Sequence, residues 1–500
     1  MPERYILAID QGTTSSRAAL VDEQGRILAM GQREFPQYFP LEGWVEHDPE
    51  EIWQSCLNAI ADALSAAGAS PTDIAAVGIA NQRETVVVWE RRSGTPVGRA
   101  IVWQDRRSAA LCEELRQAGA EPVIRKATGL TLDPYFSATK LAWLLRSDAE
   151  LRRRAEAGEL AAGTVDAWLV WKLTGGRVHA TDYTNASRTA LFHIGRGRWD
   201  DQLCDLFGVP KAMLPRAQPP ASPFGFTDPE VFGASVAITG VAGDQQAALV
   251  GQVCLRPGQA KNTYGTGAFL LAPAGRRPPL PENGLLLSVG PAASDRAPDY
   301  VLEGSVLTAG AVVQWLRDGL GIISRSDEVE ALAAAVPDSG GVTFVPAFAG
   351  LGTPHWDPHA RGLIVGITRG TTREHLARAA LEAIAFSVTE LLEAFADVLP
   401  EPIAELRADG GAARNDLLLQ LQADLAGIRV VRPAQTETTA LGAAFLAGLG
   451  HGMFASLEDL AELWHAERVF EPRMSADERS EHLARWRRAV ERSRGWAAPA

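Results

Sequence analysis

The feature that most constrains this chain is a short polar turn between two apolar runs near its N-terminus. Residues 5 to 22 read YILAIDQGTTSSRAALVD, so an apolar run ends in Asp10, four hydroxyl residues follow a glycine, and a second apolar run resumes. Two such runs around a glycine turn predict a β-hairpin. Its turn can hold phosphate oxygens, and Asp10 can hold Mg²⁺ through water. The spacing does not match a Walker A loop, and an ordinary polar hairpin is the alternative.

A second turn of the same kind stands in the other half of the chain. Residues 258 to 275, GQAKNTYGTGAFLLAPAG, again read strand, Gly-Thr turn, strand. One such hairpin per half predicts a duplicated core in which two turns grip one nucleotide's phosphates from opposite sides, although two hairpins can also be alike by chance. A third stretch, ADGGAARN at 408 to 415, is a strand ending in Asp-Gly-Gly before a helix, which lets a flat ligand such as a nucleoside approach the backbone. Taken alone, it would be interpreted as a plain strand-to-helix turn.

Length and composition limit the class of protein. A chain of 500 residues is too long for one core and suggests two large domains or several small ones. The net charge of -13 argues against a nucleic-acid partner. Four widely spaced cysteines suggest reduced core residues of a cytoplasmic protein rather than a disulfide or zinc framework. We find no signal peptide and no apolar segment of the length of a bilayer span, so we expect no stable membrane insertion.

Strands and hairpins alternate with helices along the chain, which indicates an α/β fold. Residues 48 to 67 predict a helix, because an Asp cap and a proline precede an amphipathic period. The proline-rich stretch from 214 to 229 is expected to be a connecting segment near the end of the first half. We therefore predict an N-terminal domain over residues 1–250 and a C-terminal domain over residues 251–500.

Several residues suggest a site for a small polyol. Arg83 and Glu84, in NQRETVVVW, combine a fork of donors with an acceptor at the start of a predicted strand, which suits a hydroxyl group that both donates and accepts. Trp103, Tyr135 and Phe269 offer aromatic faces for a carbon backbone. The alternatives are a salt-bridged strand edge and ordinary core aromatics.

Asp244 opens a predicted helix in AGDQQAAL. It is either a helix N-cap or a catalytic base, and a carboxylate that accepts the hydroxyl proton is sufficient for phosphoryl transfer. By contrast, His355, Asp357 and His359 in GTPHWDPHARG lie among prolines that break any helix. We therefore expect a structured loop there rather than a metal site.

The motifs DQGTTSSR, NQRET, WQDRR, TDYTNASRT, GDQQAAL, KNTYGTGAF and DGGAARN together resemble the FGGY carbohydrate kinases. They follow the order of that family from about residue 5 to about residue 450, and GLIVGITRGTTREHLARAALE resembles its C-terminal signature. The motifs NQRET, WQDRR and TDYTNASRT resemble the branch that phosphorylates glycerol more than the pentulose kinases.

The resemblance implies two actin-like (ribonuclease-H-like) domains that flank a cleft for ATP and substrate. The N-terminal domain would carry the glycerol site and the first phosphate hairpin, and the C-terminal domain the second hairpin and the adenosine site. The implied reaction moves the γ-phosphate of ATP to a terminal hydroxyl of glycerol and gives sn-glycerol 3-phosphate, with Asp244 as the base and Mg²⁺ as the cofactor.

The same resemblance assigns a role to each candidate residue. It implies glycerol contacts from Arg83, Glu84, Trp103, Tyr135, Asp244, Gln245 and Phe269. It implies nucleotide contacts from Thr13, Thr14, Ser15, Arg17, Thr266, Gly310, Gln314, Gly411 and Asn415. It implies that Asp10 and Asp244 organise the magnesium ion.

Partners and regulation complete these expectations. We expect glycerol as the small-molecule partner and a homo-oligomer, a dimer or tetramer. The stretch TDPEVFGASVAITG lacks the arginine with which some relatives bind fructose 1,6-bisphosphate, and Glu230 stands where others carry a phosphorylatable histidine, so neither control is expected. Two other functions stay open: a sister kinase for another polyol or ketose, and an actin- or chaperone-like ATPase.

Overall fold

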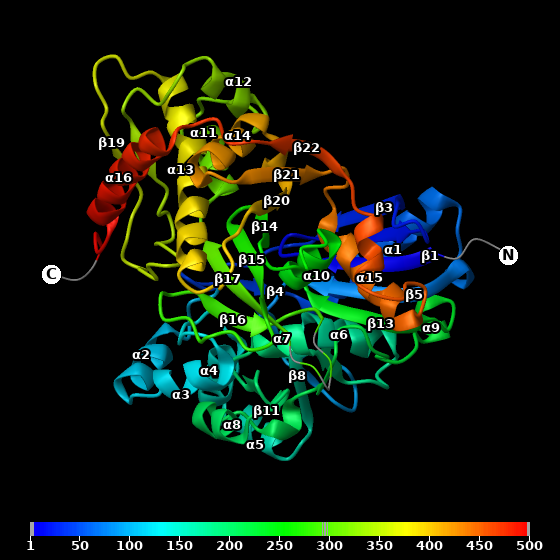
Figure 1. Ribbon diagram of the computed structural model, residues 1–500. Helices are drawn as coiled ribbons and strands as arrows, with labels where there is room; N and C mark the ends of the chain where they lie inside the picture. The colour runs from blue at the N-terminus through cyan, green and yellow to red at the C-terminus, as the bar shows by residue number, and fades with distance from the viewer. Residues whose placement is uncertain (1–4, 293, 295–296, 298, 498–500) are drawn as a thin grey trace.

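The N-terminal half is organised around a five-stranded sheet. The computed structural model describes residues 5–292, 294, 297 and 299–497 (Figure 1). The strand order is β13-β5-β1-β2-β3, with β1 antiparallel to β2, β2 antiparallel to β3, and β5 parallel to both β1 and β13. The bounds are β1 Tyr5–Gln11, β2 Ser15–Val21, β3 Ile27–Glu34, β5 Ile74–Asn81 and β13 Ala237–Gly243.

The C-terminal half repeats this topology. Its seven-stranded sheet has the order β16-β17-β15-β14-β20-β21-β22, and its inner strands β17-β15-β14-β20-β21 pair with the same directions as β3-β2-β1-β5-β13. The shared order and directions confirm an α/β fold with a duplicated core. The bounds are β14 Gln259–Tyr264, β15 Ala268–Gly275, β16 Leu286–Val289, β17 Tyr300–Val306, β20 Glu405–Asp409, β21 Arg429–Pro433 and β22 Ala466–Phe470.

Helices cover both faces of the N-terminal sheet. On one face, α1 (Pro49–Ala67) and α6 (Val165–Leu173) bury Leu7 and Ile9 of β1. As predicted, α1 starts with Asp48, whose side chain accepts the N–H of Glu50. On the other face, α10 (Asp244–Gly251) and α15 (Thr438–His451) pack on the alternate residues of β1.

The helix pair α10 and α15 joins the two halves of the molecule. Although α15 lies between β21 and β22 of the C-terminal sheet in sequence, it packs against α10 and four strands of the N-terminal sheet. Glycines allow this approach: a Cβ atom at Gly442 would lie 1.7 Å from the Ala247 carbonyl oxygen, and one at Gly78 would lie 2.1 Å from that of Ala443. The Ala/Gly-rich composition of α15 is therefore required by close backbone packing.

The C-terminal sheet is covered by long α13 (Arg373–Ala396) and by α14 (Asp416–Ala426), with α11 (Gly310–Asp318) and α12 (Glu328–Ala334) beside them (Figure 1). The C-terminal helix α16 (Ala476–Ser493) packs on these helices rather than on the sheet. On α16, Leu483, Trp486 and Val490 are buried, and the Trp486 ring stacks on Phe386 with centroids 5.2 Å apart. The small antiparallel pair β18 (Thr343–Val345) and β19 (Leu363–Val365) packs against α13 and α16.

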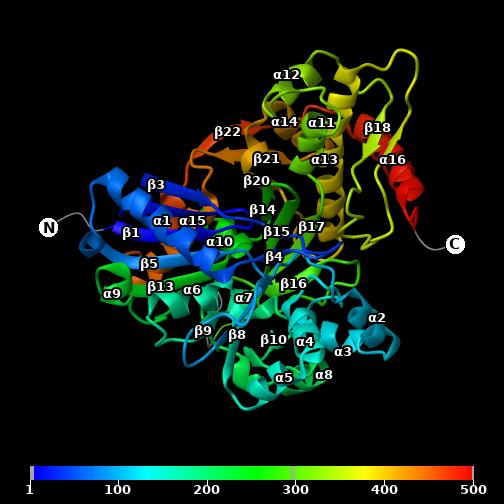
Figure 2. The same cartoon turned by 180° about the vertical axis from the view of Figure 1, so that it is seen from behind.

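Insertions between β5 and β13, together with β4 from the segment between β3 and α1, form a further lobe, seen at the bottom of Figure 2. Its sheet has the order β4-β7-β6-β8, with β4 Glu46–His47, β7 Ala100–Ile101, β6 Val86–Glu90 and β8 Leu160–Thr164. Its helices are α2 Ala109–Gln117, α3 Glu121–Thr128, α4 Ser137–Ser147, α5 Ala149–Glu156, α7 Tyr183–Ser187 and α8 Asp201–Phe207.

The proline-rich stretch is more than a connection, because β12 (Arg216–Gln218) within it pairs with β9 (Ala180–Asp182). The short pair β10 (Phe192–His193) and β11 (Arg198–Trp199) and the single-turn helix α9 (Pro229–Phe232) complete the elements. Among the described residues, no helix combines the length and the apolar character that a bilayer span requires.

Candidate active site

The first phosphate turn connects β1 to β2. The Gly12 N–H donates to the Ser15 carbonyl at 2.9 Å and closes the turn, and the ladder places Asp10 opposite Arg17. Arg17 Nη1 lies 3.5 Å from Asp10 Oδ2 and 3.8 Å from Glu437 Oε2. Burial raises the pKa of Asp10 to about 6, opposed by the Arg17 cation and reinforced by the Asp244 carboxylate. Asp10 and Asp244 therefore face a common region.

Side chains of the first turn differ in exposure. Thr14 is exposed and Thr13 half-buried, so both can meet a ligand. Ser15 is buried, and its Oγ accepts a hydrogen bond from Gln32 Nε2 at 3.1 Å. The Ser15 hydroxyl is therefore engaged by Gln32 as an acceptor and keeps its own proton to donate.

The second phosphate turn connects β14 to β15 and contacts two further predicted segments. The Thr266 carbonyl accepts from the N–H groups of Ala309 and Ala311, and the Gly310 N–H donates to the Gly265 carbonyl at 2.9 Å. A Cβ atom at Gly310 would lie only 2.5 Å from that carbonyl oxygen. On the other side, Gly410 has φ +86° and lies against the Tyr264 backbone. Thr266, Gly310 and Gly411 thus lie close together.

Two nucleotide candidates lie at the edges of this region. Gln314 is exposed on α11, one turn after Gly310. Asn415 is the N-cap of α14, where its Oδ1 accepts the Leu418 N–H at 2.8 Å. A Cβ atom at Gly411 would meet no atom within 4 Å, so there is open space beside this residue.

The acceptor candidates come from several segments of the N-terminal half and from β15. Arg83 and Glu84 are buried in the loop between β5 and β6, not at the start of a strand as predicted. Glu84 has φ +61°, a conformation that costs free energy for a residue other than glycine. The Trp103 ring lies 5.6 Å from Tyr135 and 6.3 Å from Phe269, measured between centroids.

Asp244 is the first residue of α10, directly after β13. The N-cap is Gly243, which removes the alternative that Asp244 is present as a cap. Arg83 Nε lies 3.2 Å from Asp244 Oδ1, and the Asp244 side chain is 29% exposed, so a ligand can reach it. The neighbouring Gln245 side chain accepts a hydrogen bond from Lys261 Nζ on β14.

Three charged residues of this site were missed by sequence reasoning. Arg188 Nε donates to Glu84 Oε1 at 2.6 Å, and both oxygens of Glu303 accept from the Arg83 guanidinium at 2.6 and 2.7 Å. Lys261 is fully buried, and burial lowers its pKa to about 8. A signal was present for two of them, since Glu303 and Lys261 are lone charged residues in strands that are otherwise uncharged.

The carboxylates suit a water-mediated magnesium site rather than a closed metal cage. In the part of the chain that the structure describes, no three His, Cys, Asp or Glu side chains are placed to hold a metal ion. Mg²⁺ usually binds one or two carboxylates together with waters and substrate phosphates, and Asp10 and Asp244 fit that pattern. At the discounted trio, His355 pairs with Glu390 at 3.3 Å and Asp357 accepts the His359 N–H, which confirms a structured loop.

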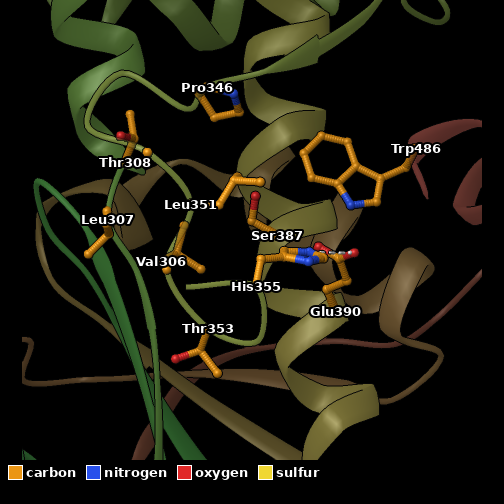
Figure 3. A pocket seen from close by; sticks show the side chains of 12 residues that line it. Val306, Leu307, Thr308, Pro346, Leu351, Thr353, His355, Ser387, Glu390 and Trp486 are labelled. Carbon is orange, nitrogen blue, oxygen red and sulfur yellow. Dashed lines mark hydrogen bonds and ion pairs between the residues drawn. The ribbon is translucent and has the colours of Figure 1, made fainter. Parts of the chain in front are cut away.

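Figure 3 shows a small pocket at that loop, between the end of β17, α13 and α16. His355 and Glu390 meet on one wall and Trp486 lies on another. None of the predicted site residues is among the described residues that line it.

Comparison with known proteins agrees with this geometry. Residues 5–251 match the N-terminal domain, and residues 260–451 the C-terminal domain, of the FGGY family of carbohydrate kinases. The chain therefore belongs to the FGGY family of carbohydrate kinases and is an α/β kinase of two related domains.

Individual proteins of known name are similar to this chain over nearly its whole length. The chain is 57% identical over 495 residues to a glycerol kinase of Trichlorobacter lovleyi, with 99% of this chain and 100% of the relative covered. It is 57% identical over 499 residues to a glycerol kinase of Bordetella parapertussis, at coverages of 99% and 98%. Its fold matches the crystal structure of Plasmodium falciparum glycerol kinase with ADP at a TM-score of 0.89, with 34% identity over 98% of each chain.

Proposed function

We propose that this protein transfers the γ-phosphate of ATP to a terminal hydroxyl of glycerol and releases sn-glycerol 3-phosphate and ADP. The observation that carries the proposal is the 3.2 Å approach of Arg83 Nε to Asp244 Oδ1, because it joins a polyol-binding guanidinium to a reachable carboxylate. The glycerol kinases at 57% identity over nearly the full chain support glycerol as the acceptor.

The chain's own residues divide the work between acceptor and donor. Arg83 and Glu84 hold the glycerol hydroxyls as donor and acceptor, and the rings of Trp103, Tyr135 and Phe269 cover the carbon backbone. Gln245 contributes a further polar contact next to the base. The three rings form one continuous apolar surface, since Trp103 lies in edge contact with both Tyr135 and Phe269.

On the donor side, the turns around Thr13, Thr14 and Thr266 supply backbone N–H groups and hydroxyls to the phosphates, with Arg17 beside the first turn. Ser15 joins the first turn, while Gly310, Gln314, Gly411 and Asn415 line the nucleotide side. Asp10 and Asp244 would hold a magnesium ion, which would supply positive charge to the phosphate oxygens.

In the transfer step, the glycerol oxygen bonds to the γ-phosphorus while the bond from that phosphorus to the β-phosphate oxygen breaks. Asp244 accepts the hydroxyl proton, and ADP leaves with the electron pair of the broken bond. Closure of the two halves around α10 and α15 would exclude water, which otherwise competes as acceptor.

A substrate panel tests this function. The purified protein is given Mg-ATP and, separately, glycerol, a ketopentose, gluconate or no acceptor, and ADP release is followed. We expect turnover that requires glycerol. Faster turnover with the ketopentose would identify a sister kinase instead, and turnover indifferent to every acceptor would identify an ATPase.

Location and assembly belong to the same proposal. We infer that the protein works in the cytoplasm, which is supported by four cysteines that are buried and unpaired. We also expect a homo-oligomer, a dimer or tetramer, which light scattering on the purified protein would measure.

A further inference from the structure

A buried acid of the C-terminal sheet contacts the acceptor side of the site from across the molecule. Glu303 lies in the middle of β17 and is fully buried. Its two oxygens accept from Arg83 Nη1 and Nη2 at 2.6 and 2.7 Å, and its Oε1 lies 3.3 Å from Arg188 Nη2. Arg83 and Arg188 both belong to the N-terminal half, so one carboxylate joins the two halves through two cations.

The contacts of Glu303 reach both members of the acceptor pair. It binds Arg83 directly and reaches Glu84 through Arg188, whose Nε donates to Glu84 at 2.6 Å. Arg83 and Glu84 therefore do not pair with one another, as a simple strand-edge salt bridge would. Each has a charged partner of its own, Glu303 for Arg83 and Arg188 for Glu84. These contacts fix the orientation of both side chains and leave their remaining polar atoms for the acceptor.

A count of the Arg83 protons shows how much orientation Glu303 provides. A guanidinium has five N–H protons. Nε faces Asp244, Nη1 contacts Glu303 and Gln246, and Nη2 contacts Glu303. Among the described residues this leaves one Nη2 proton for a substrate hydroxyl. Because the bidentate contact fixes the plane of the guanidinium, it also fixes the direction of that proton.

The charges make Glu303 indispensable at this place. Burial by itself would raise the pKa of Glu303, but the Arg188 and Arg83 cations outweigh it and lower the pKa to about 2. Without that carboxylate, two buried guanidinium groups would face one another with only Glu84 and the part-exposed Asp244 to balance them. Arg83 would then lose the bidentate contact that fixes the plane of its guanidinium, and with it the orientation of its free proton toward the acceptor.

We infer that Glu303 is a positioning residue for the acceptor: it sets the orientation of Arg83 and Glu84 from the C-terminal half, so acceptor affinity depends on how the two halves are placed. The inference rests on the proposed function for the identity of the acceptor. It assigns Glu303 no contact with substrate, and it predicts a loss that is selective for the acceptor over ATP.

The test compares Glu303→Gln with a matched control, Glu405→Gln. Glu405 is also a buried acid of the C-terminal sheet with two arginine partners, Arg407 and Arg429, but it lies on β20 and has no contact with Arg83. For Glu303→Gln we expect the KM for glycerol, and the Kd for glycerol measured by calorimetry without ATP, to rise about tenfold or more, while the KM for ATP changes less than about threefold. Glu405→Gln should leave both within about twofold.

Two further outcomes keep the inference testable. If Glu303→Gln does not fold, Glu303→Asp retains the charge on a side chain one carbon shorter and should show the same selective loss in smaller measure. An unchanged glycerol affinity, or equal losses for glycerol and ATP, would overturn the inference. If the wild-type protein prefers another polyol, the proposed function fails, and the same comparison with that polyol still decides the role of Glu303.

Discussion

Trp103 Nε1 donates a hydrogen bond to Thr13 Oγ1 at 2.9 Å, so the aromatic wall of the acceptor site is tied to the first phosphate turn. The two residues are 90 positions apart and come from different loops. This bond links the group that would cover glycerol to the group that would hold phosphate, and it sets the distance between acceptor and donor.

Removing this bond should slow the reaction more than it weakens either substrate. Trp103→Phe keeps an aromatic face but loses the N–H donor, and we expect kcat to fall about fivefold. Thr13→Val removes the acceptor of the same bond. In a double-mutant cycle, the two changes together should cost no more than the larger one alone. Additive losses would show that the bond does not couple the two sites.

Asp244→Asn tests the proposed base. The amide keeps the size of the side chain but cannot accept the hydroxyl proton, so kcat should fall by about 100-fold or more. Glycerol binding, measured by calorimetry, should be retained. Asp416→Asn is the control, because Asp416 is also the first residue of a helix. Full activity in Asp244→Asn would remove this residue from the base role.

Gly310→Ala tests the second phosphate turn. Because the new Cβ would lie 2.5 Å from the Gly265 carbonyl oxygen, the turn must shift, and we expect the KM for ATP to rise about tenfold with little change for glycerol. Gly98→Ala is the control, since a Cβ there meets no atom within 4 Å. An unchanged ATP affinity would exclude Gly310 from the nucleotide site.

Replacing Lys261 by methionine should raise the stability of the protein and lower its activity. Burial lowers its pKa to about 8, although the carboxylates of Asp409, Asp244 and Glu303 raise it, while Arg83 lowers it further. The unfolded chain therefore binds more protons between about pH 8 and pH 10.5, and the free energy of unfolding rises with pH in that window. Below about pH 8 the folded protein carries the full free-energy cost of burying the Lys261 ammonium. Lys261→Met should thus be more stable at pH 7 by about 2 kcal/mol, measured by urea unfolding.

The activity of the same variant supplies the second half of this prediction. The Lys261 ammonium donates to the Gln245 side chain, next to the proposed base, so kcat/KM of the wild type should fall above about pH 8 as Lys261 loses its proton and this contact weakens. Lys261→Met should be slower at pH 7 and should lack that alkaline decline. An identical pH profile in both proteins would show that Lys261 has only a structural role.

Local patterns account for the elements that could be predicted. The Gly-Thr turns and the Asp48 cap of α1 depend on residues within one turn or one strand of each other, so the sequence alone predicts them. The predicted position of Arg83 and Glu84 at the start of a strand was wrong, because both lie in the loop before β6. Their loop requires a positive φ at Glu84, which propensity disfavours and which the buried ion pair with Arg188 holds in place.

By itself, then, the sequence determined the α/β class, the two hairpins and the residue types that face a phosphate and a polyol, because each depends on neighbours along the chain. Only the tertiary structure decided which charged groups and helices contact those residues. Glu303 meets Arg83 across 220 positions, and α15 crosses to the opposite sheet through backbone contacts at glycines. Such pairings depend on how two folded halves pack, and no periodicity or motif encodes a distance between segments that only packing brings together.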